Sequence, residues 1–245
     1  MEKDAFQFLA NQAIQAAGKA VAVDEDKTHT FLVGEDTREF IPQNIPDELQ
    51  VSSLRSIVDF VLNSSDLGKK GQVLIEICSP REVRVEGLLD QWGRRARYMV
   101  AEPENEEFHF HNWYDREELN IALQSQFVPN DDQATLLKFI GNYQESTDQT
   151  ATDDGITQVA AVRTGAASVG NVKVPNPVTL MPYRTFPEVK QSESQFVFRM
   201  HEGMKGALFE ADGGAWRNDA IQTIKKYFGE ELTPLISRKQ VVVIG

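Results

Sequence analysis

Three short runs rich in β-branched residues follow one another between residues 72 and 101, and they read QVLIEI, EVRVEGLL and ARYMVA. Ser79-Pro80 separates the first two runs, and Gln91-Trp92-Gly93 separates the last two. Serine, proline and glycine favour turns, whereas β-branched and aromatic residues favour strands. The pattern therefore predicts an antiparallel meander.

Helical spacing of apolar residues appears on both sides of this meander. It predicts one amphipathic helix over residues 4–17 and a second over 54–62, which Ser52 or Ser53 can cap. Asp115 and Glu118 form an acidic capping box before a third helix, and Asp131 opens a fourth. Between the first two helices, THTFLVG and REFIPQ flank the turn-like GEDT, which indicates an extended hairpin or loop.

The second half of the chain is rich in β-type runs. ITQVAAVRT, NVKVP, PVTLMPYRTF, SQFVFRM and GALFEA alternate with glycines and prolines, and a helix over 215–228 and a VVVI strand follow. We therefore expect an α+β fold with mixed, mainly antiparallel sheets. The expected organisation is an acidic α+β region over 1–143, a polar linker or loop over 144–155 and a β-rich region over 156–245, with one continuous domain as the alternative.

Charge is distributed unevenly along the chain. The formal net charge is −12, and residues 1–150 hold 14 Lys and Arg against 27 Asp and Glu. This acidic body disfavours sequence-independent binding of nucleic acid, which depends on cationic groups. No apolar run approaches the roughly 20 residues that span a bilayer, and the N-terminus lacks the layout of a secretion signal. We therefore expect no membrane association and a cytoplasmic protein.

Motifs for catalysis or metal binding are weak. His109 and His111 in FHFH would share one face of a strand, but two ligands do not make a metal site. GAASVG (165–170) fits neither a nucleophile turn nor a phosphate-binding loop, so a tight hairpin explains it better. Glu188-Val189-Lys190 lacks the preceding acidic residue of a metal-dependent nuclease. We predict no catalytic residue, no metal and no cofactor.

Arginines and aromatic residues supply the candidate interaction residues. If EVRVEG and RARYM pair, Arg84 shares a face with Arg95 or Arg97, although nearby acidic residues favour ion pairing within the sheet. Arg184 lies between two aromatic residues and could stack on bases or anchor an interface, or could pair with Glu188 or Glu193. The full candidate set is Arg84, Arg94, Arg95, Arg97, Tyr183, Arg184, Phe186, Arg199, Trp216 and Arg217.

The turn Asp212-Gly213-Gly214 stands before the helix that carries Trp216. Free backbone N–H groups at such a turn could bind an anion. The alternative is a simple helix start whose Trp216 docks on the sheet.

Several segments together resemble a known family. DDGITQVAAVRTG, VPNPVTLMPYRTFPEVKQSESQFVFR and ALFEADGGAWRNDAI look like the YfdQ-like family of uncharacterised phage and prophage proteins. The similarity is clearest from Asp153 to Phe228 and weaker over SPREVRVEG and WYDREELNIALQSQFVPNDD. The resemblance implies a bacteriophage origin and expression in the host bacterial cytoplasm, and it brings no catalytic residues.

We therefore expect a non-enzymatic phage accessory protein that acts by homo-oligomeric assembly. One form of this hypothesis is a shell-forming protein of the phage-capsid or encapsulin type, suggested by the order of the expected elements. A first alternative is a nucleic-acid-associated factor in phage recombination or replication. A second is an inhibitor or decoy of a host defence protein, for which the acidic first 150 residues offer a nucleic-acid-like surface.

Overall fold

A computed structural model of the chain describes residues 8, 20–23, 30–33, 38–40, 47–65, 67, 72–142, 159–164, 168–201 and 205–245. The chain divides into two compact units. The first holds residues 1–46 and 89–94, and the second holds residues 47–88 and 95–245.

The first unit contains a small antiparallel sheet of β1 (Ala20–Val23), β2 (Thr30–Val33) and β3 (Arg38–Glu39). The pairing of β2 with β3 confirms the predicted hairpin. The segment 89–94 belongs to this unit, and the indole Nε1 of Trp92 donates a 2.7 Å hydrogen bond to Glu39 Oε1. The helix expected over residues 4–17 lies outside the described residues, apart from Phe8.

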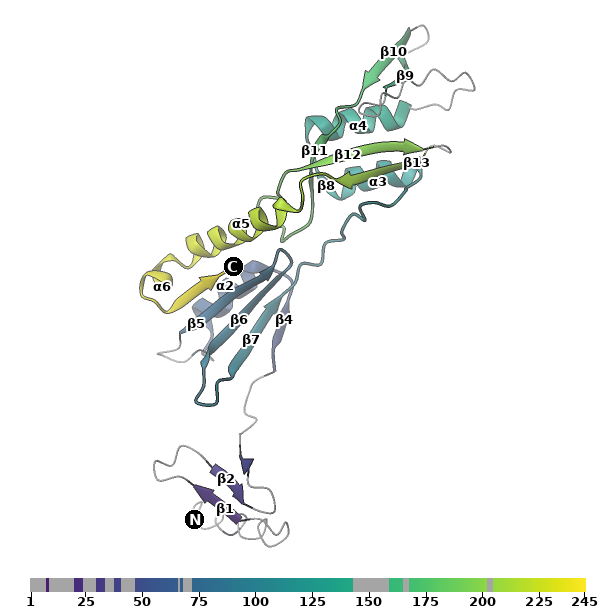
Figure 1. Ribbon diagram of the computed structural model, residues 1–245. Coiled ribbons are helices and arrows are strands. Elements are labelled where there is room, and N and C mark those ends of the chain that lie inside the picture. Colours follow the sequence, from purple (N-terminus) through teal and green to yellow (C-terminus); the bar gives the residue numbers. More distant parts are fainter. Residues whose placement is uncertain are drawn as a thin grey trace. The chain divides into compact units, whose positions relative to one another are not determined.

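The second unit contains a five-stranded sheet in the order β14-β5-β6-β7-β4 (Figure 1). Its strands are β4 (Leu49–Val51), β5 (Val73–Ser79), β6 (Glu82–Leu89), β7 (Arg95–Ala101) and β14 (Val241–Ile244). The antiparallel pairing of β5 with β6 agrees with the predicted meander. The edge strands β14 and β4 run parallel to β5 and β7, so the sheet is mixed.

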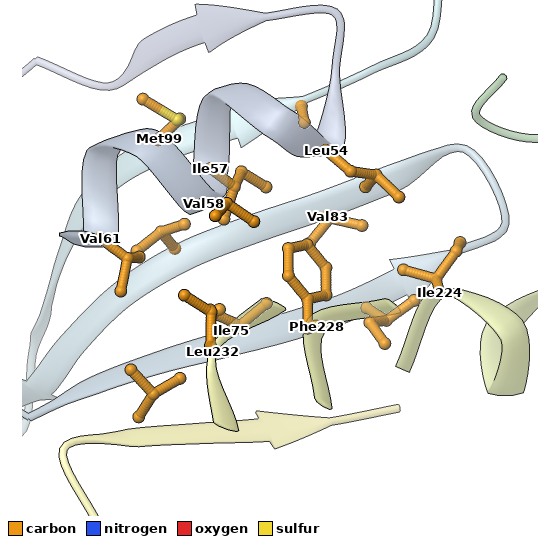
Figure 2. Close-up of a cluster of buried hydrophobic side chains, with 14 of the residues drawn as sticks. Leu54, Ile57, Val58, Val61, Ile75, Val83, Met99, Ile224, Phe228 and Leu232 are labelled. Carbon is orange, nitrogen blue, oxygen red and sulfur yellow. The ribbon is translucent and has the colours of Figure 1, made fainter. Parts of the chain in front are cut away.

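One face of this sheet is buried under helices. The helix α2 (Leu54–Asn63) begins after Ser53, whose hydroxyl accepts a hydrogen bond from the N–H of Ser56 as a helix cap. Its apolar stripe packs against the sheet and against α5 (Ala215–Glu231), as Figure 2 shows. Burial of Ile57, Ile224 or Phe228 contributes about 1.5–3 kcal/mol for each side chain.

A second core lies under a four-stranded sheet in the order β13-β12-β11-β8. The elements around this core are α3 (Arg116–Ser125), β8 (Phe127–Val128), α4 (Asp131–Asn142), β11 (Val178–Pro182), β12 (Ser194–His201) and β13 (Lys205–Glu210). Asp115 and Glu118 make the predicted capping box at α3. Because Phe127, Phe139 and Phe198 are almost fully buried, aromatic packing dominates this core.

Three more elements belong to the described chain. The strands β9 (Val159–Thr164) and β10 (Ser168–Lys173) pair antiparallel, with Thr164 opposite Ser168. This pairing agrees with the hairpin predicted at 165–170, of which residues 168–170 are described. The short helix α6 (Thr233–Ser237) follows α5.

The two regions predicted from the sequence share both larger sheets. β14 of the second region pairs with β5 of the first, and β11 pairs with β8. The linker expected over 144–155 lies outside the described residues. The described chain thus has the predicted α+β fold with mixed and antiparallel sheets. None of its described helices is both long and apolar enough to cross a membrane.

Candidate functional site

The second face of the five-stranded sheet brings together three of the candidate arginines. Strand register places Leu74 between Val242 and Glu86, and Glu76 between Ile244 and Arg84, so these six side chains share one face. We call it the open face, because Val242, Ile244, Cys78 and Leu88 on it are exposed.

The arginines of the open face surround a carboxylate. The Nε atoms of Arg95 and Arg97 lie 3.8 Å from the two carboxylate oxygens of Glu86, and Arg84 pairs with Glu82. The three arginines thus share one face, as predicted. They also pair with acidic residues of the same sheet, which the sequence had suggested as the simpler explanation of this cluster. Glu86 is buried, while the Arg97 side chain is 58% exposed. The patch is basic at its rim and neutralised at its centre.

Two other arginines near the meander serve local structure. Arg94 pairs with Asp90 at 2.9 Å across the turn, and its guanidinium lies 4.9 Å from the Trp92 ring centre. Arg81 pairs with Glu107 and donates hydrogen bonds to backbone carbonyls of the 103–105 segment. Arg94 lies in the turn at 89–94, which belongs to the first unit, whereas Arg84 belongs to the second.

Arg184 lies in a buried polar and aromatic site. Its Nη1 lies 3.0 Å from Glu210 Oε1, and its guanidinium lies 3.9 Å from the centre of the Trp216 ring. Phe110 and Phe196 flank it at 5.7 and 5.6 Å. Only 3% of Arg184 is exposed, and Phe186 is fully buried. The interaction surface expected here is therefore corrected: neither side chain is accessible, because both fill the interior.

Burial governs the electrostatics of Arg184. Desolvation lowers the pKa of its guanidinium to about 10, opposed by the negative charges of Glu210 and Asp212. Since this pKa stays well above 7, the group is charged at neutral pH. Its carboxylate partner is Glu210, 26 residues away, and not the neighbouring Glu188 or Glu193 that the sequence suggested.

The chain around Arg184 connects the two cores of the second unit. The side-chain oxygen of Gln191 accepts hydrogen bonds from the backbone N–H groups of Arg184 and Thr185. Phe186 enters the core under the five-stranded sheet, while Arg184 contacts Phe196 of the other core. The half-buried Tyr183 receives a hydrogen bond from Asn105 on its carbonyl. These contacts assign the segment a structural role.

The remaining candidates lie close to this site or on the four-stranded sheet. Trp216 is half-buried and donates its indole N–H to Glu210 Oε1 at 3.1 Å, while Arg217 stacks over the Trp216 ring at 4.8 Å. Arg199 is half-buried on β12 and donates to the Phe198 carbonyl. It belongs to a different sheet from Arg84.

The turn at residues 212–214 is capped by the side chain of Asp212. Asp212 Oδ1 accepts a 3.0 Å hydrogen bond from the N–H of Gly214, and Asp212 Oδ2 accepts a 2.7 Å bond from the hydroxyl of Ser194. Burial alone would raise the pKa of Asp212, but these hydrogen bonds and the charge of Arg184 bring it below its ordinary value. A carboxylate of the chain itself thus occupies the start of α5, where an external anion was considered.

The FHFH segment does not form the strand that its alternation suggested. Its chain turns at residues 110–111, and His111 has a backbone φ of 66°. The two phenylalanines decide this course, because Phe108 enters the core and Phe110 stacks on Phe196 at 4.9 Å. The described residues contain no group of three or more His, Cys, Asp or Glu side chains placed to hold a metal ion.

The sequence analysis missed the exposed apolar residues at the edge of the open face. Val242 and Ile244 of β14 are 47% and 42% exposed, and β14 is an outer strand of its sheet. Its composition, VVVI, resembles a buried strand, so only knowledge of its place in the sheet identifies it as an exposed edge.

No family model, curated protein or solved structure matches the chain. The resemblance to YfdQ-like proteins and the comparison with phage shells therefore rest on sequence patterns alone.

Proposed function

We propose that this protein is a non-enzymatic phage accessory protein that acts by assembling into homo-oligomers. The phage setting comes from the resemblance to YfdQ-like proteins. The observation that carries assembly is the apolar margin of the open face, which we define as Leu74, Val242 and Ile244. Val242 stands beside the half-buried Leu74 in the strand register, so the apolar surface of β14 continues onto β5.

The position of this margin favours association. An outer strand offers unpaired backbone N–H and C=O groups, and exposed apolar side chains beside them gain free energy when they leave water. Contiguous exposed apolar groups on a folded protein are typical of interaction sites.

The solution mass tests this proposal. Light scattering after size exclusion, at low and at high salt, should give a defined species of more than one chain, with an absorbance ratio free of nucleic acid. Association through apolar groups should persist at high salt, because screening weakens only charge pairs. A single-chain mass at every concentration would contradict assembly.

A nucleic-acid-associated role is the second candidate, because Arg84, Arg95 and Arg97 share the open face. Binding carried by these groups should weaken steeply with added salt. The variant Arg95→Gln/Arg97→Gln should then bind single-stranded DNA less tightly in a fluorescence titration at 50 mM salt, with Lys190→Gln as the control. Equal affinity of the two variants, or no binding by the unaltered protein, would reject this role.

A further inference from the structure

We infer that β14 pairs antiparallel with β14 of a second copy across a two-fold axis, which joins the two five-stranded sheets into one. This inference rests on the proposed function, since it names the interface through which the chain would assemble. The evidence is a difference between β14 and the other outer strands of the two larger sheets.

The other outer strands of the two larger sheets are covered or short. In the four-stranded sheet, the outer edge of β13 is hydrogen-bonded to a neighbouring segment: Tyr114 and Gly206 exchange two 2.9 Å backbone bonds, and the His111 N–H bonds to Leu208. The opposite strand β8 has two residues. In the five-stranded sheet, β4 has three residues and follows the charged pair Asp47-Glu48. Proteins use such features to prevent pairing between copies.

β14 is longer than β4 or β8, and among the described residues no segment bonds to its outer edge as Tyr114 does to β13, although Arg238 and Lys239 stand just before it. It contains four β-branched residues, with no charge and no proline, and among the described strands it pairs only with β5. An uncharged outer strand of high β propensity readily pairs with another strand. Its uncharged side chains offer no opposite charge to a charged partner strand. A proline in the partner would remove a backbone N–H that pairing needs.

Geometry favours a second copy of the same strand as the occupant. A two-fold axis perpendicular to a sheet keeps every side chain on its own face, so residue numbers opposite each other across the axis must add to an even number. Val242 then meets Val242 or Ile244 of the other copy in either central register. The apolar margin of one copy continues into the margin of the other without meeting a charge.

The size of the contact sets the expected affinity. A pair of four-residue strands lies at or below the low end of stable interfaces, which bury roughly 1,200 Å² or more. We therefore expect a dimer that dissociates on dilution rather than an obligate one.

The test compares matched charges at the two edges of the sheet. Val242→Lys places a charge in the pairing strand, and Leu49→Lys places one on β4, where Leu49 is 49% exposed. Sedimentation equilibrium of the unaltered protein should show dimers, Leu49→Lys should keep them, and Val242→Lys should weaken them about 100-fold. Mixing Val242→Lys with Val242→Glu should restore dimers, because the two-fold axis brings opposite charges together.

The possible results separate the inference from the proposed function. If Val242→Lys associates like the unaltered protein, β14 is not the interface, while assembly itself stands. If the unaltered protein is a monomer throughout, both fail. Circular dichroism verifies that each variant folds.

Cross-linking provides a second measurement that needs no charge. In a Cys78→Ser background, Val242→Cys alone should form a disulfide between copies on mild oxidation if Val242 meets Val242, and its mixture with Ile244→Cys should do so if Val242 meets Ile244, since opposite residues of antiparallel strands lie within disulfide reach. Leu49→Cys should not. Equal cross-linking on both strands would overturn the inference.

Discussion

The guanidinium carbon of Arg184 lies 3.9 Å from the centre of the Trp216 ring, while Trp216 and Arg184 both bond to the same oxygen of Glu210. One carboxylate oxygen thus fixes a cation and an indole that stack on each other. The arrangement joins the segment before β12 to the first turn of α5.

Removal of this cation should destabilise the fold strongly. Arg184→Leu leaves Glu210 without its cationic partner, and breaking an ion pair that is largely buried costs about 3–5 kcal/mol of unfolding free energy. Urea denaturation measures the change. Lys190→Leu, at an ion pair whose side chains are 77% and 57% exposed, should change stability by less than about 0.5 kcal/mol. Similar midpoints for the two variants would refute the structural role of Arg184.

Asp212 should make the protein sensitive to acid. Because its pKa in the folded state is below the ordinary value of 3.8, the folded state binds fewer protons in acid than the unfolded state. Its stabilisation is complete above that ordinary value and is lost as the pH falls through the folded value. Ser194→Ala removes a hydrogen bond to Asp212 and should reduce the fall in urea midpoint between pH 5 and pH 2.

Thr223→Ala provides the control for this measurement. It removes a hydroxyl that bonds only within α5, to the Asp219 carbonyl, so it should leave the pH dependence unchanged. An unchanged pH dependence in Ser194→Ala would show that Asp212 does not contribute to the acid response.

Cys78 should react slowly although it is exposed. Burial of the sulfur and the nearby charges of Glu76, Glu82 and Glu86 raise the pKa of its thiol to about 11. At pH 8 about 0.1% is then thiolate, against about a quarter for a thiol with an ordinary pKa near 8.5. Alkylation by iodoacetamide at pH 8 should be about 100-fold slower in the folded protein than in guanidinium chloride. Equal rates in the two conditions would contradict this assignment.

Gly206 should not tolerate a side chain. A Cβ at this position would lie 2.4 Å from a methyl carbon of the fully buried Leu119, while two bonds to Tyr114 hold the backbone. Gly206→Ala should therefore lower the unfolding free energy by about 1–3 kcal/mol in urea. Gly229→Ala is the matched control, because nothing lies within 4 Å of its Cβ in α5 and alanine favours a helix by about 0.5–1 kcal/mol. Changes of the same sign in both variants would refute the steric argument.

Local patterns predicted local structure well. The cap at Ser53 and the box at Asp115 and Glu118 need only neighbouring residues, and both appear as expected. Alternation failed in FHFH, where packing of Phe108 and Phe110 overrides the strand pattern.

Long-range relations were not accessible from the sequence. Arg184 pairs with Glu210 because the antiparallel pairing of β12 with β13 brings the end of β13 close to Arg184. The residues next to Arg184 in the sequence give no indication of this pair. The exposure of Val242 depends on β14 being an outer strand. Arg84 and Arg95 could be placed together, because a single short turn connects their strands.

The parallel pairing of β14 with β5 also affects synthesis of the chain. Gln72 and Lys239, whose hydrogen bond stands at the start of this pair, are 167 residues apart. A ribosome adds about 5–20 residues each second, so β14 is synthesised roughly 10–30 s after β5. Throughout that interval the emerging polypeptide presents β5 as an unprotected strand, so slow translation or a shortage of chaperones would cause aggregation at this stage rather than after release.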